Sequence, residues 1–439
     1  MTIFRDIMQW VAAYRTFIND NVRQVQFFML CRQSGIVLSS IILAHYLAVE
    51  AVGTIEMLML CGYLMTFFWS DALVKGYLAN QQFLREKYFV TSFMWLYFLG
   101  ALMAMVILLA GRTFLIPLFT SRQQLEGLGL FALYQVMIIP VWIAPLIGLL
   151  KGHDHILASI YVLIGPAFSI YIGLQTGADI HSALMGLFCY ALVGFLWMMS
   201  KTQFIRNLRL LLILKMIWPA TWPLVLYAVS NGIARSFDAW LVARNFDNGT
   251  FAIFRYGARE FPLVIALAAG ISTVMIPKLR EMQSLEELKY RSTRLMNICF
   301  PFVGAFILIS VPLFEFVFGA QYRDSAIIFN IYLLMTLTQL IFPQSIMTAR
   351  GDTKWLWYIS IAELLVNVVL SIFLMNEFGI IGIVWGTFIA YVFEKIVLMQ
   401  FIASRYKIKP AAIWNIPVWS GYALGLGIMF IISKWVFGI

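Results

Sequence analysis

Charged residues are scarce in this sequence of 439 residues. Asp, Glu, Lys and Arg together account for 12% of the chain, whereas a soluble domain holds about 25%. Hydrophobic residues account for 62%, and this composition excludes both a soluble multidomain enzyme and a disordered protein. Because a membrane-spanning helix needs about 20 apolar residues, the sequence predicts an all-α polytopic membrane protein.

Long polar loops, deeply placed histidines and nucleotide motifs are also missing. No loop between the apolar runs approaches the roughly 50 residues of a folded domain. The sequence has no Walker A motif, and its four histidines lie in loops or near the ends of apolar runs. The four cysteines fall inside apolar runs, which is typical of packed side chains rather than of a disulfide framework or metal site. These features favour a secondary transporter over an enzyme, with no cofactor and no metal.

Thirteen apolar segments are long enough to cross a bilayer. They comprise residues 25–48, 52–78, 88–110, 126–150, 156–175, 181–200, 212–243, 249–276, 293–318, 324–348, 355–376, 380–403 and 413–436. With the N-terminus in the cytoplasm, most of the 31 basic residues fall in cytoplasmic loops. This pattern predicts a multi-pass protein of the inner (plasma) membrane and explains the net charge of +10 without a nucleic-acid partner.

An internal repeat relates the two halves of the sequence. Its matches are Gly53-Thr54 with Gly249-Thr250, Gly152-His153-Asp154 with Gly351-Asp352, and Gly186 with Gly386. Together they predict two six-helix bundles that are related by a pseudo-twofold along the membrane normal and enclose a central cavity. Because the repeat supplies both halves of the cavity, we expect a monomer.

The repeat and the hydropathy pattern predict four regions. They are an amphipathic N-terminal cytoplasmic segment 1–24, an N-terminal six-helix bundle 25–206, a C-terminal six-helix bundle 207–410 and an extra C-terminal transmembrane helix 411–439. Within the first region, residues 3–18 have apolar side chains at helical spacing, which predicts a helix lying on the cytoplasmic membrane surface.

Ionisable residues within the apolar segments are costly in a bilayer and therefore indicate function or charge pairing. Arg255 and Arg259 are four residues apart and are expected on one helix face. A guanidinium group suits phosphate, because its planar fork donates two parallel hydrogen bonds. We predict that a cationic substrate-binding cavity contains Arg32, Arg235, Arg255 and Arg259. A second set is suited to ion coupling or charge pairing: Asp71, Lys75, Asp238, Glu260, Glu363, Asn367 and Glu394.

Simpler structural roles stay open for several of these residues. Lys75 and Lys395 are close enough to the predicted membrane interface for their amino groups to reach the headgroups. Asp71 can neutralise Lys75 or Arg32, and Asp238 can pair with Arg235 or Arg259. Glu363 and Glu394 can also join helices by hydrogen bonds.

Several stretches resemble a known group of transporters. They are Ser236-Phe237-Asp238-Ala239-Trp240, Phe251-Ala252-Ile253-Phe254-Arg255-Tyr256-Gly257, Pro277-Lys278-Leu279, Ala349-Arg350-Gly351-Asp352-Thr353-Lys354, Glu363-Leu364-Leu365-Val366-Asn367 and Gly379-Ile380-Ile381-Gly382-Ile383. With the two six-span halves, they make the chain similar to the polysaccharide (Wzx-type) flippase branch of the multidrug/oligosaccharidyl-lipid/polysaccharide exporter superfamily.

The resemblance implies a flippase that moves an undecaprenyl-pyrophosphate-linked oligosaccharide from the cytoplasmic to the outer leaflet by alternating access. It also implies a lipid-linked glycan as substrate and envelope polysaccharide assembly proteins as partners. The energy source is open between a gradient of H⁺ or Na⁺ and coupling to later use of the glycan. A cation-coupled drug or metabolite exporter of the same fold is an alternative. A membrane-embedded enzyme of envelope assembly is a third.

Overall fold

The computed structural model describes residues 21–79, 87–120, 125–150, 152–202, 210–259, 261–279, 281 and 284–438. The predicted surface helix at residues 3–18 lies outside this part of the chain. All regular structure in these ranges is helical, as the sequence predicts. The first helices are α2 Asn21–Tyr46, α3 Val49–Ala79, α4 Lys87–Ala110, α5 Arg112–Phe119, α6 Leu128–Ile143, α7 His153–Thr176, α8 Ile180–Lys201 and α9 Leu210–Asn245.

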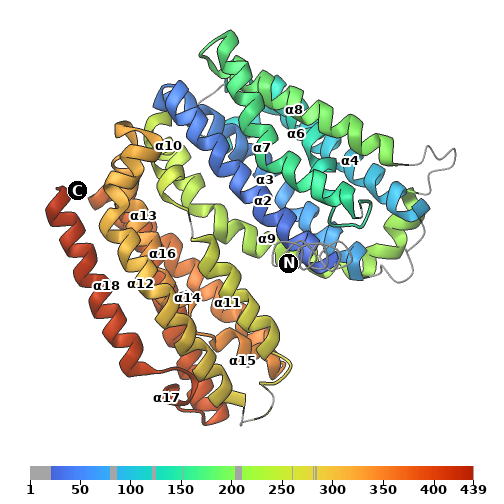
Figure 1. The fold of residues 1–439 in the computed structure, drawn as a ribbon. Helices are drawn as coiled ribbons and strands as arrows, with labels where there is room; N and C mark the ends of the chain where they lie inside the picture. The colour runs from blue at the N-terminus through green and yellow to red at the C-terminus, as the bar shows by residue number, and fades with distance from the viewer. Residues whose placement is uncertain are drawn as a thin grey trace, which may run out of the picture. The chain divides into compact units, whose positions relative to one another are not determined.

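The remaining helices include several short ones (Figure 1). They are α10 Asn248–Gly257, α11 Pro262–Met275, α12 Ser284–Phe318, α13 Ser325–Leu334, α14 Thr336–Gln339, α15 Pro343–Ala349, α16 Thr353–Tyr406, α17 Pro410–Ile413 and α18 Ile416–Phe437, with a 3₁₀ turn at Ala320–Tyr322. Each predicted apolar segment coincides with one helix, with part of α16, or with a broken series of helices.

Eight helices in the described ranges are long and apolar enough to cross a membrane. A pair bent by 42°, Ser325–Gln339 with Pro343–Ala349, raises this number to nine if it forms one span. α16 is counted once, although its 54 residues contain a break at Gly379, where φ is 60°. The count of thirteen spans and the arrangement of twelve helices plus one therefore stay predictions.

The chain divides into two compact units, which are described separately here. Unit 1 comprises Met1–Ser236 and Ala243–Gly249, and unit 2 comprises Phe237–Val242 and Thr250–Ile439. The change from one unit to the other thus falls within α9 and α10. The predicted boundary at residue 206 lies outside the described residues, and the four predicted regions stay a prediction.

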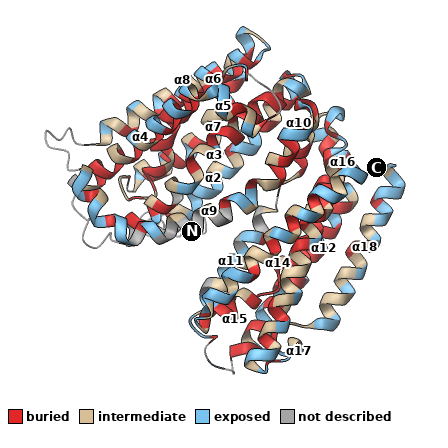
Figure 2. Ribbon diagram, turned by 180° about the vertical axis from the view of Figure 1, so that it is seen from behind, coloured by how far each residue is buried: buried red, intermediate tan, exposed pale blue. Residues whose placement is uncertain are grey.

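Large apolar side chains face outward on many helices. Figure 2 shows that α18 has mostly exposed or half-buried residues, and only 11% of its apolar window is buried. Trp435 on α18 is 85% exposed and Phe316 on α12 is 84% exposed. In water such surfaces would be unfavourable, but they are ordinary for helices in contact with lipid.

Two equivalent glycines bring helices together in the two units. In unit 1, a Cβ atom on Gly186 of α8 would lie 2.2 Å from the carbonyl oxygen of Ser169 on α7. In unit 2, a Cβ atom on Gly386 would lie 2.7 Å from the backbone nitrogen of Ser371, on the other arm of α16. Both glycines therefore allow a backbone contact that a side chain would prevent.

The same two helix pairs are each linked by an ion pair. Asp154, in the first turn of α7, lies 2.9 Å from Lys201 at the end of α8. Asp352 lies just before α16 and accepts a hydrogen bond from the Tyr406 hydroxyl at the far end of that helix. Arg405 Nε, in the last turn of α16, lies 3.3 Å from the same carboxylate. Residues that match in the two sequence repeats thus make equivalent contacts in the two units. The pseudo-twofold itself stays a prediction.

Hydrogen bonds fix where several of these helices begin. The Asp179 carboxylate accepts a bond of 2.8 Å from the backbone N–H of Ser182 and so caps α8.

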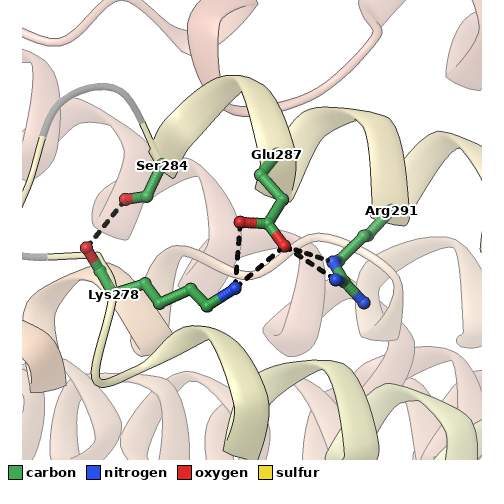
Figure 3. Close-up of polar contacts among 4 residues, drawn as sticks. All are labelled: Lys278, Ser284, Glu287 and Arg291. Atoms are coloured by element: carbon green, nitrogen blue, oxygen red, sulfur yellow. Dashed lines mark hydrogen bonds and ion pairs between the residues drawn. The ribbon is translucent and has the colours of Figure 1, made fainter.

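Between α11 and α12, Glu287 contacts both Lys278 Nζ at 3.2 Å and Arg291 Nε at 2.8 Å (Figure 3). Ser284 Oγ, in the first turn of α12, donates to the Lys278 carbonyl at 2.9 Å. These contacts stabilise the connection between α11 and α12, which contains the Pro277-Lys278-Leu279 motif.

The predicted segment 249–276 consists of two helices, with a break before Pro262. α10 ends at Gly257 and α11 begins at Pro262, whose ring nitrogen cannot donate a helical hydrogen bond. Arg259 lies in the break between them, so Arg255 and Arg259 do not share a helix face. Gly257 packs so closely on Ser325 that a Cβ atom would lie 2.5 Å from its carbonyl oxygen.

Candidate functional site

Arg32 lies in the middle of α2, within unit 1. Its Cζ atom is 5.5 Å from the centroid of the Trp142 ring on α6, in a cation–π contact. Its Nε atom is buried and has no hydrogen-bond partner. In the described ranges, no Asp or Glu forms an ion pair with it. Arg32 lies about 16 Å along α2 from its start, within Gln24–Tyr46, a stretch long and apolar enough to cross a membrane.

Two tyrosines complete the surroundings of Arg32. Tyr97 of α4 and Tyr190 of α8 are 6% and 4% exposed and lie within electrostatic range of the guanidinium. Tyr161 of α7 stacks on Tyr190 with ring centroids 4.8 Å apart and donates its hydroxyl to the Tyr190 backbone carbonyl. The result is a cation framed by aromatic rings from α4, α6 and α8. Such a setting offers an anion a charged partner, and the half-buried Trp142 offers a sugar ring a flat apolar face.

In unit 2, Arg259 occupies the break between α10 and α11. Its Cζ atom lies 4.9 Å from the centroid of Tyr256, which in turn stacks on Tyr322 at 4.5 Å. Arg255 is half-buried in the last turn of α10. Breaks in membrane helices occur where irregular backbone is buried in protein or lines a cavity, and substrate sites of transporters are often formed there.

A buried cluster of oxygen atoms surrounds Asp238 in unit 2. Thr387 Oγ1 lies 2.6 Å from Asp238 Oδ2, 3.2 Å from Asn367 Oδ1 and 3.3 Å from the Ile383 carbonyl. Ser371 Oγ lies 2.8 Å from Asn367 Oδ1 and 3.3 Å from the same carbonyl. Thr387 and Ser371 each have one hydroxyl hydrogen for more than one nearby acceptor, and the Tyr332 hydroxyl is a further hydrogen-bond partner of Asp238. The cluster is therefore suited to a proton or a small hard cation.

A second polar group lies on the same two arms of α16. Glu394 Oε2 contacts Lys395 Nζ at 3.2 Å and accepts a bond of 3.1 Å from Gln344 Nε2 of α15. The side chains of Lys395 and Glu394 are only 15% and 14% exposed. Glu363, 8% exposed, is within electrostatic range of Glu394 and of Asp238. Among the predicted ion-coupling residues, the structure thus gathers Asp238, Glu363, Asn367 and Glu394 in unit 2.

Four predicted residues remain: Arg235, Lys75, Asp71 and Glu260. Arg235 and Lys75 are exposed on α9 and α3. The side chain of Asp71 and the whole of Glu260 lie outside the described residues. Asp238 forms no ion pair with an arginine in the described part of the chain, and its partners are instead the Thr387 and Tyr332 hydroxyls.

Sequence analysis missed several residues of these groups. Ser371 follows Asn367 by four positions, and this helical spacing is a signal that the sequence contains. The contact of Thr387 with Asp238 and that of Trp142 with Arg32 carry no comparable local signal, because each joins residues about 110 positions or more apart along the chain.

Comparison with known proteins establishes the fold. No protein-family model and no curated protein matches the sequence. A lipid II flippase, MurJ, in its inward closed conformation is similar over 94% of this chain and 92% of its own, with a TM-score of 0.63 at 18% identity. An inward-facing multidrug resistance MATE family transporter of the MOP superfamily is similar over 88% and 98%, with a TM-score of 0.57 at 15% identity. A MATE protein in the straight conformation has a TM-score of 0.52 at 15% identity, over 90% and 99%.

The chain therefore has the fold of MOP-superfamily transporters. Its apolar helices and this fold together define a multi-pass membrane protein. The expected transporter architecture is confirmed at this level, and the Wzx-type branch stays a prediction.

Proposed function

We propose that this protein is a flippase that moves an undecaprenyl-pyrophosphate-linked oligosaccharide from the cytoplasmic to the outer leaflet of the inner membrane. The observation that carries the proposal is Arg32, whose buried Nε atom has no hydrogen-bond partner, whose guanidinium lies over the Trp142 ring, and which forms no ion pair within the described residues. A cation in this position is costly unless it serves an anionic ligand.

The chemistry of the substrate matches this environment. A pyrophosphate accepts paired hydrogen bonds from arginine, and the pyranose rings of a glycan can stack on tryptophan and tyrosine. The polar headgroup cannot cross hydrocarbon unaided, because its hydroxyl and phosphate groups would lose their hydrogen bonds. The isoprenoid tail can remain in lipid throughout. Arg255 and Arg259 add cationic groups at the helix break of unit 2.

We assign the ion coupling that drives directional movement to the oxygen cluster of unit 2. Asp238, Asn367 and Thr387 offer a site at which H⁺ or Na⁺ can bind and stabilise one state of an alternating cycle. We propose that the protein acts as a monomer with its N-terminus in the cytoplasm, alongside envelope polysaccharide assembly proteins.

The test uses cells in which variants replace the native protein. Arg32→Gln removes the charge and is expected to abolish surface glycan, whereas Arg32→Lys keeps the charge and is expected to retain part of it. Arg112→Gln, at an exposed arginine of α5, serves as the matched control and is expected to behave as the native chain. Normal surface glycan with Arg32→Gln, at native protein levels, contradicts the proposal.

A cation-coupled drug or metabolite exporter is the second candidate. The specific observation in its favour is the acceptor-rich cluster at Asp238, which suits an antiporter as well as a flippase. Proteoliposomes separate the two, since an exporter moves a cationic dye in response to an imposed proton or sodium gradient. Dye transport that is lost with Asp238→Asn and unchanged with Arg32→Gln favours the exporter. The third candidate, an envelope enzyme, requires turnover of a lipid-linked sugar by the purified chain.

A further inference from the structure

Glu363 is a buried carboxyl group that lies outside the oxygen cluster at Asp238. It is 8% exposed and lies on the first arm of α16, about 15 Å from the start of the helix by helical rise. Its side chain forms no hydrogen bond and no ion pair with the residues that the structure describes. An ionised carboxylate in such a place is costly, so its charge has to be balanced or removed.

The position of Glu363 on α16 places it beside the oxygen cluster. Glu363, Asn367 and Ser371 follow one another at intervals of four residues, and all three are buried. Asn367 Oδ1 lies 3.2 Å from Thr387 Oγ1 of the second arm, which in turn lies 2.6 Å from Asp238 Oδ2. Glu363 therefore lies one helical turn from the cluster, on the face that the first arm packs against the second.

Three carboxyl groups and one ammonium group supply the charges of this region. Asp238, Glu394 and Lys395 are within electrostatic range of Glu363, and among the described residues no other charged group is. Lys395 Nζ lies 3.2 Å from Glu394 Oε2, so these two charges balance each other. Asp238 is held by the Thr387 and Tyr332 hydroxyls, which are neutral. Asp238 and Glu363 are thus the two carboxyl groups without a basic partner in this part of the chain.

The surroundings of these two carboxyl groups suit different ions. Oxygen atoms of Thr387 and Asn367 lie around Asp238, whose Oδ1 atom is itself buried with no hydrogen-bond partner. Such oxygen atoms can replace the water molecules around a metal cation. Glu363 has no comparable ligands among the described residues. A proton needs none, because it forms a covalent bond with the carboxylate oxygen and removes the charge.

We propose that Glu363 binds a proton and so forms a second ion site next to the cation site at Asp238. One proton on Glu363 and one monovalent cation at Asp238 together balance the two unpaired carboxyl groups. With the cation bound, an ionised Glu363 would be the one charge of this group left unbalanced, so the proton stays in place. The cation at Asp238 rests on the proposed function, whereas the proton on Glu363 follows from the burial and the charges described here.

Two buried glutamates of α16 provide a matched test by thermal unfolding of the purified full chain at neutral pH. Glu363→Gln replaces a protonated carboxyl group by a neutral group of the same shape. It is expected to keep or raise the unfolding temperature, because the folded chain no longer has to take up a proton. Glu394→Gln removes the charged partner of Lys395 and is expected to lower the unfolding temperature by several degrees. Equal losses in the two variants would overturn the proposal, because they would show that Glu363 is ionised in the folded chain.

The infrared spectrum detects the proton directly. A protonated carboxyl group has a carbonyl stretching band that an ionised carboxylate lacks, and the spectra are recorded at neutral pH with saturating Na⁺. The native chain and Glu377→Gln, at an exposed residue of α16, are expected to show this band, and Glu363→Gln is expected to lose it. A native spectrum without the band, or a band of native intensity in Glu363→Gln, would overturn the proposal.

A separate measurement keeps the proposed cation coupling distinct from the proton. Na⁺ is expected to raise the unfolding temperature of the native chain and of Glu363→Gln, since both keep the oxygen cluster at Asp238. If Na⁺ stabilises neither chain, the metal cation assigned to Asp238 is overturned, while the infrared band still decides whether Glu363 holds a proton.

Discussion

Thr387 Oγ1 lies 2.6 Å from Asp238 Oδ2, and this contact joins residues 149 positions apart in the sequence. Asp238 belongs to the last turns of α9, and Thr387 belongs to the second arm of α16. The carboxylate is 6% exposed and the threonine 4% exposed. Within the described residues, this buried acidic group is thus held by neutral hydroxyls and not by a basic residue, which leaves it able to take up a cation.

Substitution of Thr387 tests this arrangement. Thr387→Val is expected to lower the free energy of unfolding by about 1–3 kcal/mol, because it leaves a buried acceptor unsatisfied. Thr387→Ser keeps the hydroxyl and serves as the control. The measurement is the thermal unfolding of the purified chain with and without added Na⁺ and across pH.

The native chain and Thr387→Ser are expected to be stabilised by the coupling cation, and Thr387→Val to be stabilised less. An identical cation response in Thr387→Val would show that the cluster does not take part in cation binding.

The close helix contact at Gly386 predicts a strong effect of a single methyl group. Gly386→Ala places a Cβ atom 2.7 Å from the Ser371 backbone nitrogen and is expected to destabilise the chain by about 1–3 kcal/mol through overpacking. Gly186→Ala is expected to act in the same way in unit 1. Gly425→Ala on α18 has no atom within 4 Å of the added methyl group and is the matched control.

Thermal unfolding in detergent measures all three glycine variants. Gly425→Ala is expected to be neutral or slightly stabilising, because alanine favours the helix. If Gly186→Ala and Gly386→Ala unfold at the same temperature as Gly425→Ala, the close backbone contacts are not present.

Asp352 predicts a pH effect outside the membrane. The hydrogen bond from the Tyr406 hydroxyl, together with Arg405, holds the pKa of this carboxyl below its usual value. A lowered pKa in the folded state gives stability that is present above the unfolded pKa of about 3.9 and is lost as the pH falls through the folded pKa. Asp352→Asn is therefore expected to lower stability near neutral pH and to weaken its dependence on pH below about 4.

The measurement is the unfolding temperature of the native chain and of Asp352→Asn as the pH is lowered from neutrality. The difference between them is expected to shrink as the medium becomes acidic. A constant difference over this range would contradict the role assigned to Tyr406 and Arg405.

Hydropathy alone located the helices, because each span must hold enough apolar residues to cross the bilayer whatever it packs against. Gly257 and Pro262 are both visible in the sequence, and Pro262 favours a break in this segment, but the sequence does not show that two separate helices, α10 and α11, form there. Both residues are tolerated within membrane helices, so neither one alone determines whether the helix bends or ends. The contact between Arg32 and Trp142 joins α2 to α6, and no local pattern reveals such a pairing. The predicted recurrence of Gly186 as Gly386, by contrast, corresponds to equivalent helix contacts in both units.

The most direct test of the central claim is the fate of undecaprenyl-linked glycan in cells depleted of this protein. If the protein is the flippase, the complete lipid-linked repeat unit accumulates on the cytoplasmic face while surface glycan is lost. Cells expressing Arg32→Gln are expected to show the same accumulation, and cells expressing Arg112→Gln are not. Normal lipid-linked pools together with normal surface glycan after depletion would contradict the account.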